Sequence, residues 1–402
     1  MLSVTNAALT LANYRRFRSL PDREGSVDRP VWVLIPARDE ATRIAAVIAD
    51  LRAQTGVTDL RVRICDDDSG DGTGAAAAAA IAGDPRFELL TNRQTPPPGW
   101  TGKTHVLDLL TADLDTDEDH TVMFIDADVR LGPRAIADAA LASSRVGGLL
   151  TVWPAQIAGS PLEQLVQPLL CWSFMGSVPM LVSEKLRPRS MAVANGQFLV
   201  SSAADYRRAG GHRAVRADIT EDLALARRYR DVGLTSSVRG GPDVASCRMY
   251  ECPADTWQGY RRWLGTEFGG PAGAVVVAAV MGTAYLLPWW HLMTGRRRTR
   301  AAVAIAAATT SRLVARRAET GTTDVVDVWS ALAHPVAVSV GIAALADSLR
   351  SRRRGTLAWK GRTLTTGEAS PPPPSVLFRP PTGPLNPPTG PSQPPTARRQ
   401  GR

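Results

Sequence analysis

Short apolar runs that end in acidic or polar loops constrain the fold of this chain more than any other feature. They are residues 31–35, 60–65 and 121–125, and the loops that follow them are residues 36–40, 66–73 and 126–128. Helical patterns separate the runs, because apolar residues recur at helical spacing over 44–51 and an alanine-rich stretch follows Gly74. Alternating strands and helices predict an α/β fold with a mostly parallel sheet flanked by helices. Ligands bind at the C-terminal ends of the strands in such sheets, so the acidic loops form the candidate site.

Length and cysteine content narrow the class of protein. With 402 residues, of which 44% are hydrophobic, the chain is long enough for one large α/β domain with appendages or for two domains. None of its four cysteines forms a C-x-x-C pair, which argues against a zinc ribbon and a disulfide framework and fits a reducing compartment.

Positive charge is concentrated in the C-terminal quarter. Residues 296–402 contain 16 arginines and one lysine against five acidic residues, so they carry +12, whereas residues 1–295 carry −3. A membrane surface or a nucleic acid could attract such a basic region. Apolar segments flank the arginines, and aromatic residues are not interleaved with the basic ones. We therefore predict a membrane partner and no nucleic acid.

Two apolar segments are candidates for membrane helices. Residues 268–295 contain no Asp, Glu, Lys or Arg over 28 positions. At about 1.5 Å per residue this is enough to cross a bilayer core of about 30 Å. Residues 328–346 are uncharged but are interrupted by His334 and Pro335, and arginine clusters follow both segments. A single crossing would place the first cluster on the outer face, against the positive-inside tendency, so re-entrant and interfacial arrangements stay open.

Composition predicts four regions. Residues 1–29 form an N-terminal segment, either a remnant membrane anchor or a frayed helix, and residues 30–265 form the α/β domain. Residues 266–350 are expected to be membrane-associated helices. Residues 351–402 are basic and proline-rich, with 12 of the 30 prolines in the last 32 positions, and are predicted to be a disordered tail.

The loop over residues 66–73 contains four aspartates and two glycines. Its opening matches a calcium-binding EF-hand loop, but Ala78 stands where that loop has its glutamate, and a strand rather than a helix precedes it. A solvated Asp-Gly turn is a second alternative. We favour a loop that hydrogen-bonds a nucleoside, because carboxylates accept from base N–H groups and ribose hydroxyls while glycines permit the sharp turn.

Asp126 and Asp128 follow an apolar strand and are separated by one residue. On an extended chain such side chains point the same way, and two neighbouring carboxylates repel unless a cation or a shared proton intervenes. Hard oxygen ligands suit Mg²⁺ or Mn²⁺, which can bridge a diphosphate and stabilise the charge on a departing nucleotide. Phosphatases with a D-x-D nucleophile need a following Thr-type partner, whereas Val129-Arg130 follows here.

Glu221 and Asp222 stand at the start of an amphipathic helical pattern. One interpretation is purely structural, because acidic side chains are favourable at a helix N-terminus. The same placement also suits a general base, a carboxylate held at a rigid helix start and facing a cleft. His212 lies in a Gly-Gly-His loop just upstream that could line this cleft, although a lone histidine is more often structural.

Two further stretches carry candidate polar contacts. The turn-rich loop 96–103 contains Trp100 and ends in Lys103, which could neutralise a phosphate, although the spacing is not that of a P-loop. Asn195 and Gln197 precede a predicted strand at 198–201 and could hydrogen-bond sugar hydroxyls.

Taken together and in order, these motifs resemble the family 2 glycosyltransferases, which have the GT-A fold. The matching residues are Pro36-Ala37-Arg38-Asp39-Glu40, Asp66-Asp67-Asp68-Ser69, Asp71-Gly72-Thr73, Gly99-Trp100, Gly102-Lys103, Asp126-Ala127-Asp128, Asn195-Gly196-Gln197 and Glu221-Asp222. The Pro-Gly-Trp-Thr-Gly-Lys loop, the C-terminal apolar segments and Trp359-Lys360-Gly361-Arg362 are similar to a membrane-bound subgroup that acts on carotenoid and hopanoid lipids.

The resemblance implies a role for each matching residue. Asp67 would contact the nucleoside, Asp126 and Asp128 would hold the diphosphate through Mg²⁺ or Mn²⁺, and Asp222 would be the base with Glu221 beside it. The other expected donor contacts are Pro36, Arg38, Glu40 and Lys103, and the expected acceptor or sugar contacts are Trp100, Asn195, Gln197 and His212. Enzymes of this family invert the anomeric carbon by direct displacement, so no covalent nucleophile is expected.

The implied activity is transfer of one hexose from a UDP-hexose to a carotenoid or other isoprenoid acceptor at the cell membrane, with the catalytic domain facing the cytoplasm. Processive members carry Q-x-x-R-W, whereas Gln258 and Arg262-Trp263 are separated by one extra residue, which favours a single transfer. One alternative is a synthase for polysaccharide or polyprenyl-phosphate sugars. An alternative of another class is a non-catalytic membrane scaffold that keeps the fold.

Overall fold

The computed structural model describes residues 1–18, 20, 25–114, 119–268, 270–356, 358–359 and 362–363. These residues belong to one compact unit, Met1–Gly367. Residues 364–402, most of the predicted disordered tail, lie outside the described part of the chain. The region boundaries given above therefore stay predictions.

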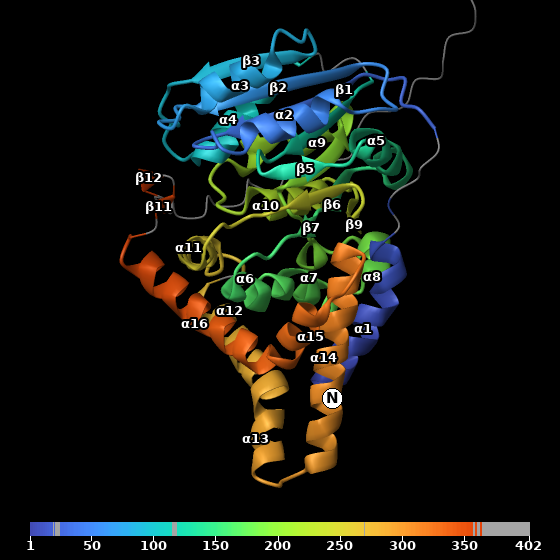
Figure 1. Ribbon diagram of the computed structural model, residues 1–402, viewed down its shortest axis with the longest axis vertical. Coiled ribbons are helices and arrows are strands. Elements are labelled where there is room, and N and C mark those ends of the chain that lie inside the picture. The colour runs from blue at the N-terminus through green and yellow to red at the C-terminus, as the bar shows by residue number, and fades with distance from the viewer. Residues whose placement is uncertain are drawn as a thin grey trace, which may run out of the picture. The chain divides into compact units, whose positions relative to one another are not determined.

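A seven-stranded sheet forms the centre of the α/β part, with strand order β3-β2-β1-β4-β8-β6-β9 (Figure 1). The first four strands in this order are parallel, β8 is antiparallel to both of its neighbours, and β9 is parallel to β6. The strands are β1 (Val31–Ala37), β2 (Leu60–Asp67), β3 (Phe87–Asn92), β4 (Thr121–Ile125), β6 (Leu149–Trp153), β8 (Phe198–Ser202) and β9 (Ser236–Gly240). The predicted α/β class and mostly parallel sheet are thus confirmed.

Side chains alternate between two apolar layers along each central strand, as the period of two requires. In β1, Val33 and Ile35 pack on one face, in the same cluster as residues of α2 (Ile44–Arg52), α3 (Thr73–Ile81) and α5 (Ala135–Val146). Leu34 packs on the other face with residues of α4 (Gly102–Thr111), α9 (Ala203–Ala209) and α10 (Glu221–Asp231). Helices therefore cover both faces of the sheet.

A small second sheet and several short elements surround the strand ends. They are β5 (Val129–Leu131), β7 (Ala155–Gln156), β10 (Ala245–Cys247), α6 (Pro161–Val166), α7 (Pro168–Met175), α8 (Met180–Leu186), η1 (Arg189–Met191), η2 (His212–Val215) and α11 (Pro253–Trp263). In the small sheet β10 lies between β5 and β7, so it ties the segment after β4 to the segment after β6.

The remaining helices lie beyond the strand ends, and the first of them and the last three pack on α6, α7 or α11. They are α1 (Leu2–Phe17), α12 (Pro271–Met281), the π-helical turn η3 (Gly282–Leu286), α13 (Leu287–Met293), α14 (Arg298–Thr320), α15 (Val325–Leu332) and α16 (His334–Arg353), followed by the short strands β11 (Ala358–Trp359) and β12 (Arg362–Thr363). The chain reverses after α13 and returns as α14, and α1 runs along α14 (Figure 1). Residues 2–17 thus form a packed helix, with the Phe17 side chain fully buried.

One helix, Pro271–Met293, is long and apolar enough to cross a membrane. Two bent pairs, α6–α7 with α8 and α15 with α16, pass the same criterion only if each pair counts as one span, which would make up to three spans in the described part of the chain. The predicted apolar span over residues 268–295 therefore corresponds to α12, η3 and α13.

Candidate active site

A cavity of about 1360 Å³ lies at the C-terminal ends of β1, β2 and β4. Most of the residues predicted for the site line it, although they come from six separate stretches of sequence. They are Pro36, Arg38, Glu40, Asp67, Lys103, Asp126, Asp128, Asn195, Gln197, Glu221 and Asp222. Fold topology thus brings the acidic loops and the start of α10 into one cleft.

Two predicted site residues do not line this cavity. His212 is 1% exposed, its Nδ1 lies 2.8 Å from the Tyr206 hydroxyl, and its ring packs edge-on against Phe124. Burial lowers the pKa of His212 to about 4, so the ring is neutral. Trp100 packs against His105 instead of facing the cavity. The expected acceptor contacts of His212 and Trp100 therefore have no support in this geometry.

The loops after β1 and β2 are held together by side chain to backbone hydrogen bonds. Asp39 has a left-handed backbone conformation (φ 50°), its N–H donates to Ser69 Oγ at 3.0 Å, and Gly70 N–H donates to Asp39 Oδ1 at 3.0 Å. Glu40 N–H donates to Thr73 Oγ1 at 2.8 Å. These contacts use the loop's polar groups internally, and β2 rather than a helix precedes it, so the calcium-loop alternative is excluded.

Asp67 is held at the end of β2 by two partners. Its Oδ1 accepts from Asn92 Nδ2 at 2.8 Å, and Arg38 Nη1 donates to the Asp67 main-chain oxygen at 2.6 Å. Asp67 is 4% exposed and lines the cavity. Asn92 has no motif of its own in the sequence, and only the pairing of β3 with β2 brings it here.

Lys103 lies between two carboxylates from different parts of the chain. It sits in the first turn of α4, which Thr101 caps by accepting from Thr104 N–H, and its Nζ lies 2.8 Å from Asp126 Oδ1 and 3.0 Å from Glu221 Oε1. Burial opposes the charged ammonium, but the two carboxylates outweigh it and raise the pKa of Lys103. In return, Lys103 outweighs burial at Glu221 and lowers the pKa of that carboxyl. Glu221 is therefore ionised and forms an ion pair with Lys103.

Asp128 is a buried carboxyl whose ionisation is disfavoured by its surroundings, in spite of the nearby positive charges of Arg43 and Lys103. Burial, followed by the charges of Asp126 and Glu40, raises its pKa to about 7. Its Oδ1 is buried and has no hydrogen-bond partner among the described residues. A buried acceptor of this kind is expensive unless a ligand or an ion satisfies it.

The carboxylates of Asp126 and Asp128 fit one part of a divalent-metal shell. Residues 126–128 form a turn closed by Val129 N–H to the Asp126 oxygen at 3.2 Å, so the extended conformation assumed from the sequence is wrong. Both side chains nevertheless line the cavity. No group of three His, Cys, Asp or Glu side chains in the described part of the chain could hold a metal by itself. A diphosphate and water would have to supply the remaining oxygen ligands, as is usual for Mg²⁺.

Asp222 lies in the first turn of α10 with both carboxylate oxygens bound to backbone. Oδ2 accepts from Gly196 N–H at 2.7 Å, and Oδ1 accepts from Leu223 N–H at 2.7 Å. Gly196 permits this approach, because a Cβ there would lie 3.3 Å from the Asp222 Cβ. Burial and the charge of Glu221 raise the pKa of Asp222 to about 6, the range of a general base near neutral pH.

This pKa predicts how transfer to a hydroxyl acceptor depends on pH. If Asp222 is the base that the resemblance implies, it cannot take a proton from the acceptor while it is itself protonated, so kcat should rise through pH 6 and level off above it. Removing the charge of Glu221 with Glu221→Gln should move the rise to lower pH, because that charge is one cause of the raised pKa. Profiles of kcat against pH for both proteins test this, and a wild-type profile that is flat across pH 6 would contradict it.

A buried chain of amide side chains lies beneath the cavity floor. Gln167 Nε2 donates to Gln156 Oε1 at 3.1 Å, and Gln156 Nε2 donates to Gln197 Oε1 at 2.8 Å. Gln197 in turn supports the site, because its main-chain oxygen accepts from Asp126 N–H at 3.1 Å and its Oε1 also accepts from Asn195 Nδ2 at 3.0 Å. Asn195 and Gln197 are thus bound within the protein, a role that differs from the sugar contacts expected for them.

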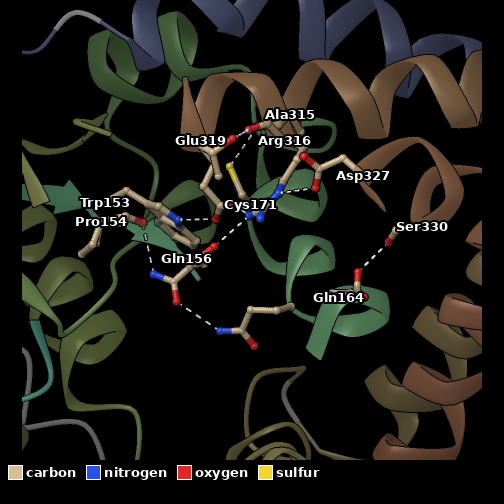
Figure 2. Close-up of polar contacts among 12 residues, drawn as sticks. Trp153, Pro154, Gln156, Gln164, Cys171, Ala315, Arg316, Glu319, Asp327 and Ser330 are labelled. Atoms are coloured by element: carbon tan, nitrogen blue, oxygen red, sulfur yellow. Dashed lines mark hydrogen bonds and ion pairs between the residues drawn. The ribbon is translucent and has the colours of Figure 1, made fainter. Parts of the chain in front are cut away.

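Figure 2 shows that these hydrogen-bonded amide side chains connect to charged residues of α14 and α15. Arg316 Nη1 donates to the Gln156 main-chain oxygen at 2.9 Å and forms ion pairs with Glu319 at 2.9 Å and Asp327 at 2.8 Å. Trp153 Nε1, at the end of β6, donates to Glu319 Oε1 at 2.9 Å. The helices beyond the strand ends are therefore fixed to the sheet by a buried ionic cluster.

Breaking this cluster is expected to destabilise the protein strongly. Arg316→Met leaves Glu319, which is fully buried, without its cation, and such a loss costs about 3–5 kcal/mol. The matched control is Arg317→Met, one residue along the same helix on an exposed side chain, which should change stability little. Thermal unfolding in detergent compares the two, and equal midpoints would show that the cluster contributes nothing net.

Comparison with known proteins identifies a family match for part of the chain. Residues 32–142, from β1 to α5, match the family model for glycosyl transferase family 2. The chain therefore carries a domain of glycosyl transferase family 2, a family of enzymes, as the strand-end motifs indicated.

Two curated relatives have the same name, 4,4'-diaponeurosporenoate glycosyltransferase. The protein from Staphylococcus haemolyticus (strain JCSC1435) is 27% identical over 234 residues, which are 57% of this chain and 59% of that protein. The protein from Staphylococcus aureus (strain bovine RF122 / ET3-1) is 26% identical over 258 residues, which are 63% of this chain and 65% of that protein. The match thus spans less than two thirds of either relative.

Among solved structures, the mannosyltransferase PcManGT from Pyrobaculum calidifontis, in complex with GDP-Man and Mn²⁺, is 18% identical. It aligns over 85% of this chain and 99% of its own, with a TM-score of 0.47.

Proposed function

We propose that this protein transfers one hexose from a UDP-hexose to an isoprenoid acceptor of the carotenoid class, by metal-assisted inverting displacement. The proposal rests on the kinds of side chain that line one continuous cavity. Strand-end acids and Lys103 line one part of it, and apolar side chains of α7, α12 and α16 line another. Its volume of about 1360 Å³ exceeds the roughly 300–1,000 Å³ of a site for one small ligand, so two substrates can share it.

The donor belongs at the acidic end. Asp67 is fixed by Asn92 and Arg38, which suits recognition of N–H and hydroxyl groups of a nucleoside. Asp126 and Asp128 would hold Mg²⁺ or Mn²⁺ together with the diphosphate. When bound, the ion neutralises the charge that develops on the departing diphosphate. Lys103, already beside Asp126, supplies a second positive charge at that point.

Asp222 is the group best placed to act as base. Its neighbour Glu221 is bound to Lys103, whereas Asp222 receives only backbone N–H groups and has a raised pKa. Asp222 takes the proton of an acceptor hydroxyl while the acceptor oxygen bonds to the anomeric carbon and the bond from that carbon to the diphosphate breaks. Attack opposite the leaving group inverts the anomeric centre, so no covalent nucleophile is required. An acceptor carboxylate, already ionised near neutral pH, needs the base less.

Membrane attachment and a cytoplasmic catalytic domain complete the proposal. Pro271–Met293 is long and apolar enough to cross a bilayer. All four cysteines are free, and three of them are buried, which suits a reducing compartment. The curated relatives are named for a diaponeurosporenoate substrate, and an isoprenoid of this class suits the apolar part of the cavity.

A transfer assay tests the function directly. The detergent-solubilised protein is given Mn²⁺, UDP-[¹⁴C]glucose or another labelled UDP-hexose, and a long-chain isoprenoid alcohol or acid, and label in the organic phase is measured. Acceptor-dependent label on products with one sugar each supports the proposal. Products with long sugar chains would support a synthase instead. UDP binding without turnover of any donor would support a non-catalytic scaffold.

A further inference from the structure

Exposed apolar side chains are confined to one part of the molecule. In the described part of the chain, the large hydrophobic residues that face solvent lie on α1, α8 and α12–α16, apart from Met1 and Ile157. None lies between residues 25 and 156, where the α/β layers are. An apolar surface of this extent is a binding surface for a protein or a membrane, and the burial pattern of α1 decides between them.

Helix α1 buries a row of small polar side chains, ending in Phe17, and exposes several apolar side chains elsewhere on its surface. Ser3, Asn6, Thr10 and Asn13 recur at helical spacing and are all less than 9% exposed, and Asn13 Nδ2 donates to the main-chain oxygens of residues 175 and 178 at 2.9 and 2.8 Å. Val4 and Leu11 lie on the opposite side and are 45% and 56% exposed, and Leu2, at the start of the helix, is 54% exposed.

This arrangement is the reverse of that in a helix on a water-soluble domain. It is the pattern of helices in lipid, which associate through small and polar side chains and turn their apolar side to acyl chains. Ser3 Oγ also donates to the Ala284 main-chain oxygen at 2.9 Å, so α1 is joined in this way to the π-helical turn of the apolar span. We conclude that lipid is the partner of this surface.

The cavity opens on this apolar surface. Leu2, Val276 and Val280 line the cavity, yet they are 54%, 61% and 45% exposed, so the cavity wall and the outer surface meet at these side chains. Asp222 lines the same cavity, and apolar residues such as Met281 and Ile342 line it as well. One continuous space therefore joins the lipid-facing surface to the candidate base.

We infer that the acceptor enters sideways from the bilayer, through the opening between the start of α1 and α12, and reaches Asp222 with its polar end first. This inference rests on the proposed function, since it concerns the acceptor of that reaction. An apolar chain that moves along this path keeps its hydrocarbon out of water throughout, because the bilayer and the cavity wall are both apolar. The polar end alone passes to the acidic part of the cavity.

The opening can be narrowed without touching the acidic end. Val276→Trp and Val280→Trp place a bulky ring at the opening, whereas Val275→Trp is the matched control, because Val275 is 66% exposed on the same helix but does not line the cavity. Two acceptors with the same polar end are compared, a long-chain polyisoprenoid alcohol in vesicles and prenol, a five-carbon allylic alcohol that dissolves in water. Melting curves verify that all three variants fold.

We expect Val276→Trp and Val280→Trp to lower kcat/KM for the vesicle-borne acceptor by about tenfold or more and to leave kcat/KM for prenol nearly unaffected. The Val275→Trp variant should resemble the wild type with both acceptors. Equal losses on both acceptors, or the same loss in Val275→Trp, would overturn the inference.

A binding measurement separates this inference from the activity. Parinaric acid, a polyene carboxylic acid that fluoresces in apolar surroundings, should bind the wild type and Val275→Trp but bind Val276→Trp weakly. If the wild type glycosylates neither acceptor, the proposed function fails, and the fluorescence result still decides whether the apolar path is open. Unchanged binding by Val276→Trp would contradict the path itself.

Discussion

Replacing Asp222 by asparagine is expected to lower kcat for a hydroxyl acceptor by about 10²–10⁴-fold, the usual contribution of a general base. The side chain keeps its size but loses the ability to take a proton. Steady-state rates at saturating donor measure the loss. Asp231→Asn, at the other end of the same helix in a partly exposed ion pair with Arg189, is the matched control and should retain activity within about twofold.

The same variant distinguishes two kinds of acceptor. A carboxylic acid acceptor is ionised near neutral pH and attacks without giving up a proton, so Asp222→Asn should impair its glycosylation much less. Asparagine can accept only one of the two backbone hydrogen bonds that Asp222 now accepts, so the melting temperature must be followed in parallel. Equal losses on both acceptors at unchanged stability would mean that Asp222 does not act by removing the acceptor proton.

The double replacement of Asp126 and Asp128 by asparagine is expected to lower kcat/KM by about 10³-fold or more. A metal held at these carboxylates stabilises the transition state by several kcal/mol, and each 1.36 kcal/mol corresponds to a factor of ten. Rates are measured across a range of Mn²⁺ concentrations. A variant that keeps the metal dependence of the wild type would show that the ion binds elsewhere.

The melting temperature should respond to a substitution at this site differently from the rate. Folding raises the pKa of Asp128 from 3.8 to about 7, so the folded chain holds this proton more tightly than the unfolded chain does. Ionisation between these values therefore lowers stability, and the full penalty is present above pH 7. Without metal at pH 8, Asp128→Asn should melt no lower than the wild type, whereas the stabilisation of the wild type by Mn²⁺ should be absent from the variant.

The strand-end acids could be predicted because local sequence determines where they lie. An apolar run followed by a polar loop marks the end of a buried strand, and the ends of parallel strands meet at one edge of the sheet. Asp126, Asp128 and the loop 66–73 follow from this rule, whereas the choice of Asp67 within that loop came from the family resemblance. Asp222 required more, because only the packing of α10 beside Gly196 brings it to the same cavity.

Partners that come from distant segments could not be predicted. Asn92 and Gln156 occupy positions where the sequence shows no motif, and each acts through a residue far away in the chain. For His212 the sequence was misleading. Its position beside a glycine pair suggested that it lines the cleft, whereas in the fold it is buried against Tyr206. By contrast, the polar residues of α1 recur at helical spacing, and this can be read from the sequence. Only the fold shows that these polar residues lie on the buried side of the helix.

The partly buried Arg316 of the C-terminal helices could not be assigned a role from the sequence either. Arg316 belongs to the basic quarter of the chain, which suggested an anionic surface as its partner. In the fold it is instead neutralised by Glu319 and Asp327 and supports Gln156 from behind. Net charge thus suggested a partner for the region as a whole, but it could not indicate how this individual residue is used.

The central claim is that strand-end acids bind a nucleotide diphosphate together with a metal ion, and calorimetric titration with UDP tests it most directly. We predict that UDP binds the wild type when Mn²⁺ is present, binds far more weakly in EDTA, and loses the metal-dependent part of its affinity when Asp126 and Asp128 are both replaced by asparagine. UDP affinity that is the same with and without Mn²⁺, or the same in the wild type and the double variant, would contradict the claim.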